Sequence, residues 1–112
     1  MPALSDYNYI DSYRSAEDAL NGNNSKVIGN NTKLVRSGDT IQVRLYGNRI
    51  IIFYPQGYMK LYDGGYQSST TKDRLNRYTP SDFNIVQRDF TWYAKRGSKK
   101  KEFTSGLKVN TR

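Results

Sequence analysis

The feature that most constrains this chain is a two-residue alternation of apolar and polar side chains over residues 40–46. Ile41, Val43 and Leu45 fall on one side of an extended chain, and the residues between them fall on the other. This period is typical of a β-strand with one buried face. Residues 49–54 are apolar on both faces of an extended chain, which predicts a central strand.

Turn residues at short intervals divide this region into hairpins. Gly47 and Asn48 predict a two-residue hairpin turn, because both tolerate a positive φ. Met59 and Leu61 are expected to point inward from the last strand of the series. Consecutive hairpins of this kind predict an antiparallel meander. The expected strands lie at residues 33–36, 40–46, 49–54 and 58–62, with turns at 37–39, 55–57 and 63–65.

A short helix is expected before the sheet region, at residues 15–22. Ser15 can cap it, and Glu17 and Asp18 then fall in the first turn, where the helix dipole favours anions. Gly22 can adopt the left-handed conformation that ends a helix. Loops rich in asparagine are expected at residues 23–25 and 29–31.

A second helix is expected at residues 69–78. Thr70 as N-cap, with Asp73 three residues later, predicts an Asp-containing capping box, and Pro80 stops the helix. One helical face should dock on the sheet, and three cations should remain in water. The docking residues are Thr71, Leu75 and Tyr78, and the cations are Lys72, Arg74 and Arg77.

The C-terminal third predicts a second hairpin, with strands at 83–88 and 90–95 around Asp89. Phe90, Trp92 and Ala94 are expected on one face of it. A flexible basic loop at 96–101 and a short strand at 107–109 follow. The predicted fold class is therefore α+β in a single domain: an antiparallel meander, one packed helix and a second hairpin. Its regions are an acidic, Tyr-rich arm with a short helix at 1–24, a β-rich core at 25–95 and a basic tail at 96–112.

The absence of two residue types restricts the chemistry. The chain has no cysteine and no histidine, which removes disulfides, thiol nucleophiles and the commonest metal ligands. The acids fall mostly in expected turns and helix starts, so we expect a protein without enzymatic activity, metal or cofactor. Carboxylate-dependent catalysis is a third hypothesis of low weight. No apolar run approaches the roughly 20 residues that span a bilayer, and no secretory signal is expected.

The charge of the chain is segregated along its length. The formal net charge is +8, yet residues 1–24 contain four acids and one base. Residues 94–112 contain seven bases and one acid. A segregated basic end is typical of a polyanion-binding protein, although charge can also serve solubility alone.

Residues 64–76 carry a resemblance to a known family. They read Gly-Gly-Tyr-Gln-Ser-Ser-Thr-Thr-Lys-Asp-Arg-Leu-Asn. This run resembles the core motif of a family of small, uncharacterised proteins of phages and mobile elements, in which a Gly-Gly-aromatic step leads into Thr-Thr-Lys-x-Arg-Leu-Asn. The similarity covers residues 26–93, but Tyr66 stands where the family often has tryptophan. The resemblance implies a phage or mobile-element origin and supplies no catalytic residues.

Three constellations are candidates for nucleic-acid or anion binding. The first is a basic and aromatic sheet face, where rings could stack on bases and cations could hold phosphates; ordinary packing is the alternative. The second is the Gly-Gly step and the helix start, which offer N–H groups to an anion, unless caps already satisfy them. The third is the basic tail, which could bind phosphates or be a solvated tail. The candidate residues are Arg44, Tyr46, Lys60, Tyr62, Tyr66, Thr70, Thr71, Lys72, Arg74, Arg77, Arg96, Lys99, Lys100 and Lys101, with Tyr58 on the same sheet face.

The leading hypothesis is a phage-encoded accessory protein, without enzymatic activity, that binds nucleic acid or a nucleotide-like anion. The alternative is a protein-binding module, either an inhibitor of a host defence or replication factor, or a minor virion component. Tyrosine-rich surfaces suit either partner. The expected compartment is the host cytoplasm, with the virion as the alternative, and a homo-oligomer stays open.

Overall fold

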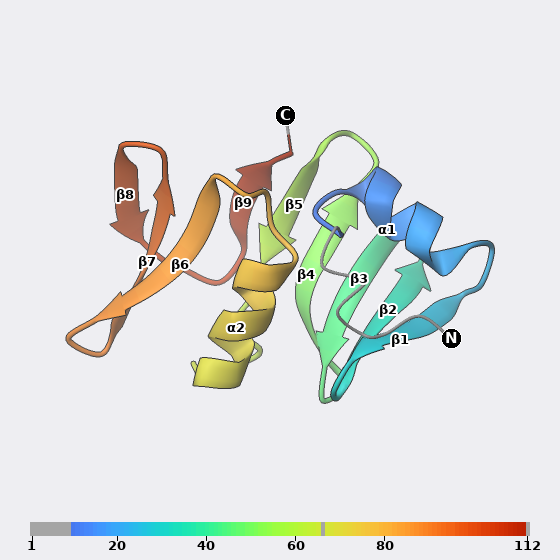
Figure 1. The fold of residues 1–112 in the computed structure, drawn as a ribbon, viewed down its shortest axis with the longest axis horizontal. Helices are drawn as coiled ribbons and strands as arrows, with labels where there is room; N and C mark the ends of the chain where they lie inside the picture. The colour runs from blue at the N-terminus through green and yellow to red at the C-terminus, as the bar shows by residue number, and fades with distance from the viewer. Residues whose placement is uncertain (1–9, 66, 112) are drawn as a thin grey trace.

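The computed structural model describes residues 10–65 and 67–111, and in this part of the chain two antiparallel sheets are joined by short connections and accompanied by two helices (Figure 1). The predicted α+β single domain is confirmed. The elements are α1 (Tyr13–Leu20), β1 (Ser25–Gly29), β2 (Thr32–Ser37), β3 (Thr40–Leu45), β4 (Asn48–Tyr54), β5 (Tyr58–Leu61), α2 (Ser69–Arg77), β6 (Phe83–Arg88), β7 (Thr91–Arg96), β8 (Lys99–Glu102) and β9 (Leu107–Asn110).

The larger sheet is the predicted meander, extended at both edges. Its strand order is β1-β2-β3-β4-β5-β9, so the apolar strand β4 lies in the middle, as predicted. The strand β9 returns from the C-terminus to pair with β5, with Met59 opposite Val109. The sequence predicts a short strand there but not its place. Figure 1 shows β9 beside β5 at the edge that faces the smaller sheet.

The strand β1 was missed. Residues 23–25 and 29–31 were expected as loops, but Ser25 and Gly29 are the first and last residues of β1. Val27 pairs with Lys33 across the hairpin. The apolar alternation of β1 is short, and the asparagines on both sides of it favour turns. The segment forms a strand because it pairs with β2.

The hairpin between β3 and β4 turns one residue earlier than predicted. Leu45 pairs with Asn48, so the two turn residues are Tyr46 and Gly47, with φ angles of 52° and 81°. The predicted turn at Gly47 and Asn48 is wrong. The pairing register shifts between Val43, which is opposite Ile51, and Arg44, which is opposite Arg49. This β-bulge adds one residue to β4, so the strand keeps its inward and outward faces although the turn comes one residue early.

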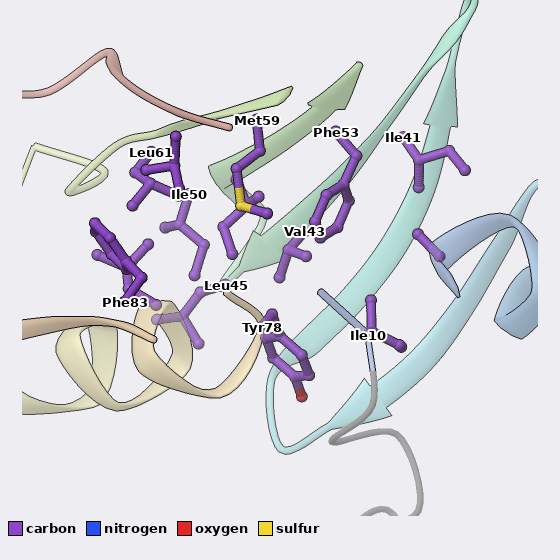
Figure 2. Close-up of a cluster of buried hydrophobic side chains, with 14 of the residues drawn as sticks. Ile10, Ile41, Val43, Leu45, Ile50, Phe53, Met59, Leu61, Tyr78 and Phe83 are labelled. Atoms are coloured by element: carbon purple, nitrogen blue, oxygen red, sulfur yellow. The ribbon is translucent and has the colours of Figure 1, made fainter. Parts of the chain in front are cut away.

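The inner face of the larger sheet, defined here as the face bearing Ile41, Val43, Phe53, Met59 and Leu61, is buried. Figure 1 shows both helices on the same side of this sheet. The helix α1 buries Ala16, Ala19 and Leu20, and α2 buries Thr71 and Leu75. Figure 2 shows Tyr78 and Leu45 among the side chains of this core. The prediction that Thr71, Leu75 and Tyr78 dock together is confirmed by their burial.

The helix α1 begins earlier than predicted. Its N-cap is Ser12, whose Oγ accepts from the N–H of Ser15 at 3.2 Å, and Ser15 accepts in return from the N–H of Ser12 at 3.0 Å. Ser15 is therefore the third helical residue of a capping box, not the cap. Glu17 and Asp18 lie beyond the first turn, which contains no acid, so the dipole argument does not apply to them.

The predicted cap of α2 is also wrong. The N-cap is Ser68, whose Oγ accepts from the N–H of Thr71 at 3.1 Å. Thr70 is the second helical residue. The Arg74 side chain is only 15% exposed, and its Nε donates to Thr32 Oγ1 at 3.0 Å. The prediction that Arg74 remains in water is therefore wrong.

The smaller sheet has the order β6-β7-β8. The hairpin around Asp89 is present, with Trp92 and Ala94 buried. Phe90, however, lies in the turn with a φ of 67° and is 93% exposed, so it does not share their face. The loop expected at residues 96–101 is largely the strand β8, because Lys99, Lys100 and Lys101 pair with β7.

Candidate nucleic-acid interface

A cleft of about 650 Å³ lies between the smaller sheet and the edge strand β9 of the larger one. We call it the basic cleft. Its apolar lining comes from Phe83, Ala94, Leu107 and Val109, and its polar lining includes Ser98 and Asn110. No acidic residue of the described chain lines it. The six cations that line it are Lys95, Arg96, Lys99, Lys100, Lys101 and Lys108.

The register of β8 directs two lysines to the cleft side of the smaller sheet. Lys101 pairs with Ala94 and Lys99 pairs with Arg96. Paired residues point to the same face of a sheet, and Ala94 is buried on the face that meets the rest of the core. Lys99 and Lys101 are exposed and stand two residues apart, roughly 6.7 Å along the strand. That separation is comparable with the spacing of neighbouring phosphates on a polynucleotide strand.

Lys100 points to the opposite face of β8. Its Nζ lies 4.6 Å from the centroid of the Tyr93 ring, which is within the range of a cation–π contact. Lys95 pairs with Lys100, so these two ammonium groups share that face near the rim of the cleft. Glu102, which pairs with Tyr93, points to this same face, so a carboxylate of the protein accompanies the two ammonium groups.

Arg96 differs from the lysines because it has protein partners. Its Nε donates to Asp82 Oδ2 at 3.0 Å, and its Nη1 donates to the carbonyl oxygen of Asn110 at 2.6 Å. Asn110 belongs to β9, so Arg96 links the two sheets across the cleft. Its charge is partly neutralised by Asp82, and its first role is to position the walls.

The start of α2, the second predicted constellation, forms a separate cavity of about 280 Å³ that Thr70, Thr71 and Asp63 help to line. Thr71 Oγ1 lies 2.9 Å from Ser68 Oγ, so both hydroxyls have partners. Asp63 is a carboxylate in the same wall, which opposes an anion. Arg74 also has protein partners here, including Asp73.

The remaining cations of α2 contact neighbouring side chains. Lys72 Nζ donates to Gln87 Oε1 at 3.4 Å, and Arg77 forms an ion pair with Asp73 at 3.5 Å. The structure does not bring these residues into the basic cleft. Tyr66, which belongs to the same predicted constellation, lies outside the described residues, as do residues 1–9 of the N-terminal arm.

The first constellation lies on the outer face of the larger sheet, which is the face opposite the helices. Lys60 is on this face, because it alternates with the buried Met59 and Leu61, as predicted. Arg44 Nε donates to Gln42 Oε1 at 3.0 Å. Tyr46 is 67% exposed in the β3–β4 turn, far along the sheet from the basic cleft in strand order.

Tyrosine rings on the β5 side of the outer face already have partners. Tyr54 and Tyr58 stack with centroids 4.6 Å apart and an interplanar angle of 18°. The guanidinium of Arg49 lies 4.9 Å from the centroid of the Tyr62 ring. These contacts favour a surface of fixed rings and cations over a set of free stacking platforms.

The sequence signals found part of the basic cleft. The Lys99–Lys101 run and Arg96 were chosen by charge density. Lys95 and Lys108 were missed, since they are single cations in strand patterns and join the others only through the pairing of β7 with β8 and of β9 with β5. Tyr54 was missed because it ends an apolar run.

Two further observations bear on the site. In the part of the chain that the structure describes, no helix is long and apolar enough to cross a membrane. No group of acidic side chains among the same residues is arranged to hold a metal ion.

The fold and the site together define a class: a small α+β protein with a basic cleft between two antiparallel sheets. Residues 12–110 match the family described as Kyanoviridae Gp96 protein, and the chain belongs to this phage protein family. Of the phage or mobile-element family that the resemblance implied, the match confirms a phage protein family, while the correspondence of individual motif residues stays a prediction. No curated protein and no solved structure matches the chain.

Proposed function

We propose that this phage protein is a non-enzymatic accessory protein that binds nucleic acid through the phosphate backbone, in the basic cleft. The observation that carries the proposal is the lining of the cleft, which contains six cations and, among the described residues, no acid. The natural setting for such binding is the cytoplasm of the infected host cell.

The physical basis is the release of counterions. Each lysine that neutralises a phosphate frees a condensed cation, so affinity comes without any reading of sequence. The lysines of β8 are exposed, and no carboxylate is paired with them within the described residues. Their charge is therefore available to a ligand, in contrast to that of Arg96.

Lysines on an edge strand also have a purely structural use, because they discourage pairing with the edges of other molecules. The strand β8 is an edge of the smaller sheet. The experiment below separates this use from binding, because edge protection concerns self-association and leaves affinity for nucleic acid unaffected.

The test is a double variant, Lys99→Gln with Lys101→Gln, which leaves Arg96 and the link between the sheets intact. The matched control, Arg14→Gln with Arg88→Gln, removes the same charge from α1 and from the end of β6. Binding to a fluorescent polynucleotide is measured against salt. The cleft variant should bind more weakly, and its log–log salt slope should become shallower by about 1.4, at roughly 0.7 per lost contact to a single strand. If it behaves like the control, the cleft is not the binding site.

A protein-binding function is the second candidate, favoured by one observation. Phe90 is 93% exposed at the tip of the β6–β7 hairpin, and exposed aromatic side chains are common anchors at protein contacts. Phe90→Ala should leave polynucleotide binding unchanged and abolish capture of a host or virion protein. Retention of that capture by the variant would remove Phe90 from this role.

A further inference from the structure

The strands that form the outer face of the larger sheet contribute cations to it and no acids. The six strands β1–β5 and β9 contain neither Asp nor Glu. Both described helices pack on the inner face (Figure 1). The outer face therefore presents its cations without a carboxylate from its own strands, and a polyanion is the partner that its charge fits.

On the β5 side of this face, rings and ammonium groups form one chain of contacts. The Nζ of Lys108 lies 4.4 Å from the centroid of the Tyr58 ring. Tyr58 stacks on Tyr54, and the Nζ of Lys60 lies 5.7 Å from the centroid of the Tyr54 ring. Cation–π contacts of this kind hold the ammonium groups in place.

Lys108 connects this chain of contacts to the basic cleft. It lines the cleft, and it also lies over Tyr58 on the outer face. Lys60 is its direct neighbour across the β5–β9 pair. The cations thus continue from β8, past the edge strand β9, to β5, with no acidic residue in β5 or β9.

We propose that the ligand is a single-stranded nucleic acid, whose backbone runs from the basic cleft over β9 to Lys60 on the outer face. The inference rests on the proposed function and names its ligand class. A duplex does not follow this path, because its persistence length is about 50 nm, whereas the path turns around the edge of one sheet. A single strand bends at every nucleotide.

The tyrosines on this path position cations and do not stack on bases. Tyr58 already contacts a ring and an ammonium group, so its faces are occupied. Binding should therefore be tolerant of base identity, and the path adds affinity in proportion to the phosphates that it reaches. Tyr58 is a positioning residue for Lys108.

The first experiment compares strand lengths. Oligo(dT) and oligo(U) of about 4 and about 16 nucleotides, the range of single-strand site sizes, are titrated against wild type, Lys60→Gln and Lys33→Gln. Lys33 is an exposed lysine of β2 on the same outer face, away from the path. Lys60→Gln should make the salt slope shallower by about 0.7 for the long strand only. Lys33→Gln should leave the affinity and the slope unchanged for both lengths. A 16-base-pair duplex should bind more weakly than either long strand.

The second experiment tests the positioning role through Tyr58. Tyr58→Phe keeps the ring and should retain the affinity and salt slope of the wild type for the long strand. Tyr58→Leu should reduce affinity two- to fivefold, a loss of about 0.4–1 kcal/mol, with the same far-UV spectrum. Equal behaviour of the two variants would overturn this role.

The outcomes separate the path from the function. If the Lys99 and Lys101 double variant weakens binding but Lys60→Gln does not weaken it for the long strand, the path is wrong and the proposed function stands. A duplex that binds as tightly as the single strand also overturns the path. If no polynucleotide binds the wild type at low salt, both proposals fail.

Discussion

The two sheets differ in what their side chains do. The larger sheet turns a mostly apolar face toward the helices, and its residues Ile41, Val43 and Phe53 are fully buried. The smaller sheet buries a few residues, such as Trp92, while all four residues of β8 are exposed. Burial of apolar area supplies most of the stability of a fold. The larger sheet therefore carries stability, which leaves the smaller sheet free to carry charge.

The connection between the sheets is partly polar. Asn76 of α2 receives a hydrogen bond from the N–H of Ile85 at 2.6 Å and donates to the Ile85 carbonyl at 3.0 Å. Its amide thus acts as a strand partner for the edge strand β6, which also protects that edge. Arg96 of β7 makes a second polar link, to the carbonyl oxygen of Asn110 in β9. Both links fix the geometry of the cleft.

The largest effect on stability is expected from Asn76→Ala, which breaks the amide link. The N–H and carbonyl of Ile85 would both lose their partner, at a cost of about 1–3 kcal/mol. Denaturant unfolding measures the change, with Asn84→Ala, an exposed residue of the same strand, as the control. Equal stability of the two variants would show that the smaller sheet is held without this link.

Ser68→Ala is expected to cost about 1 kcal/mol, because the N–H of Thr71 loses its capping acceptor. Thr70→Ala is the matched control, since Thr70 is the second residue of the helix, and it should change the denaturant midpoint little. This pair checks the support that α2 gives to the larger sheet. A larger loss for Thr70→Ala would restore the original prediction of its cap.

Phe90→Gly is expected to stabilise the protein by about 0.5–1 kcal/mol. Phe90 has a positive φ of 67° in a two-residue turn, a conformation that costs a non-glycine residue roughly 1–2 kcal/mol. Gln87→Gly, in the neighbouring strand, should instead destabilise by a similar amount. Thermal unfolding compares the two, and a loss of stability in Phe90→Gly would show that this tip is not strained.

The smallest effect concerns alkaline pH and the core of the larger sheet. Burial is the main cause that raises the pKa of Tyr78, and Arg77 and Arg74 partly oppose it. The folded state therefore keeps a proton that the unfolded chain loses near pH 10, and stability falls as pH rises above that value. The stability difference between wild type and Tyr78→Phe should shrink or turn against the wild type above pH 10. A difference that is flat in pH would contradict the effect.

The fold was predictable where local pattern and tertiary pairing agree. The strands from β2 to β5 follow from alternation and turn residues. The strand β8 could not be predicted, because four charged residues carry no apolar period and form a strand only by pairing with β7. The turn at Tyr46 and Gly47 was misplaced because glycine followed by asparagine is the stronger local signal, whereas the bulge in β4 settles the register.

The candidate site was predictable as a charge density but not as a shape. The lysine run is visible in the sequence, yet the cleft exists because β9 pairs with β5 and brings Lys108 near it. Arg96 looks equal to the lysines in the sequence. Only the structure shows that Asp82 and Asn110 already hold it.

The salt dependence of polynucleotide binding tests the central claim most directly. Binding of a 16-nucleotide single strand to the wild-type protein is measured between roughly 50 and 200 mM salt. With Lys99, Lys101 and Lys108 on phosphates in the cleft and Lys60 on a phosphate beyond it, the log–log slope should lie between about −2 and −3. A slope near zero, or no binding at the lowest salt, would contradict the assignment of the basic cleft as a nucleic-acid interface.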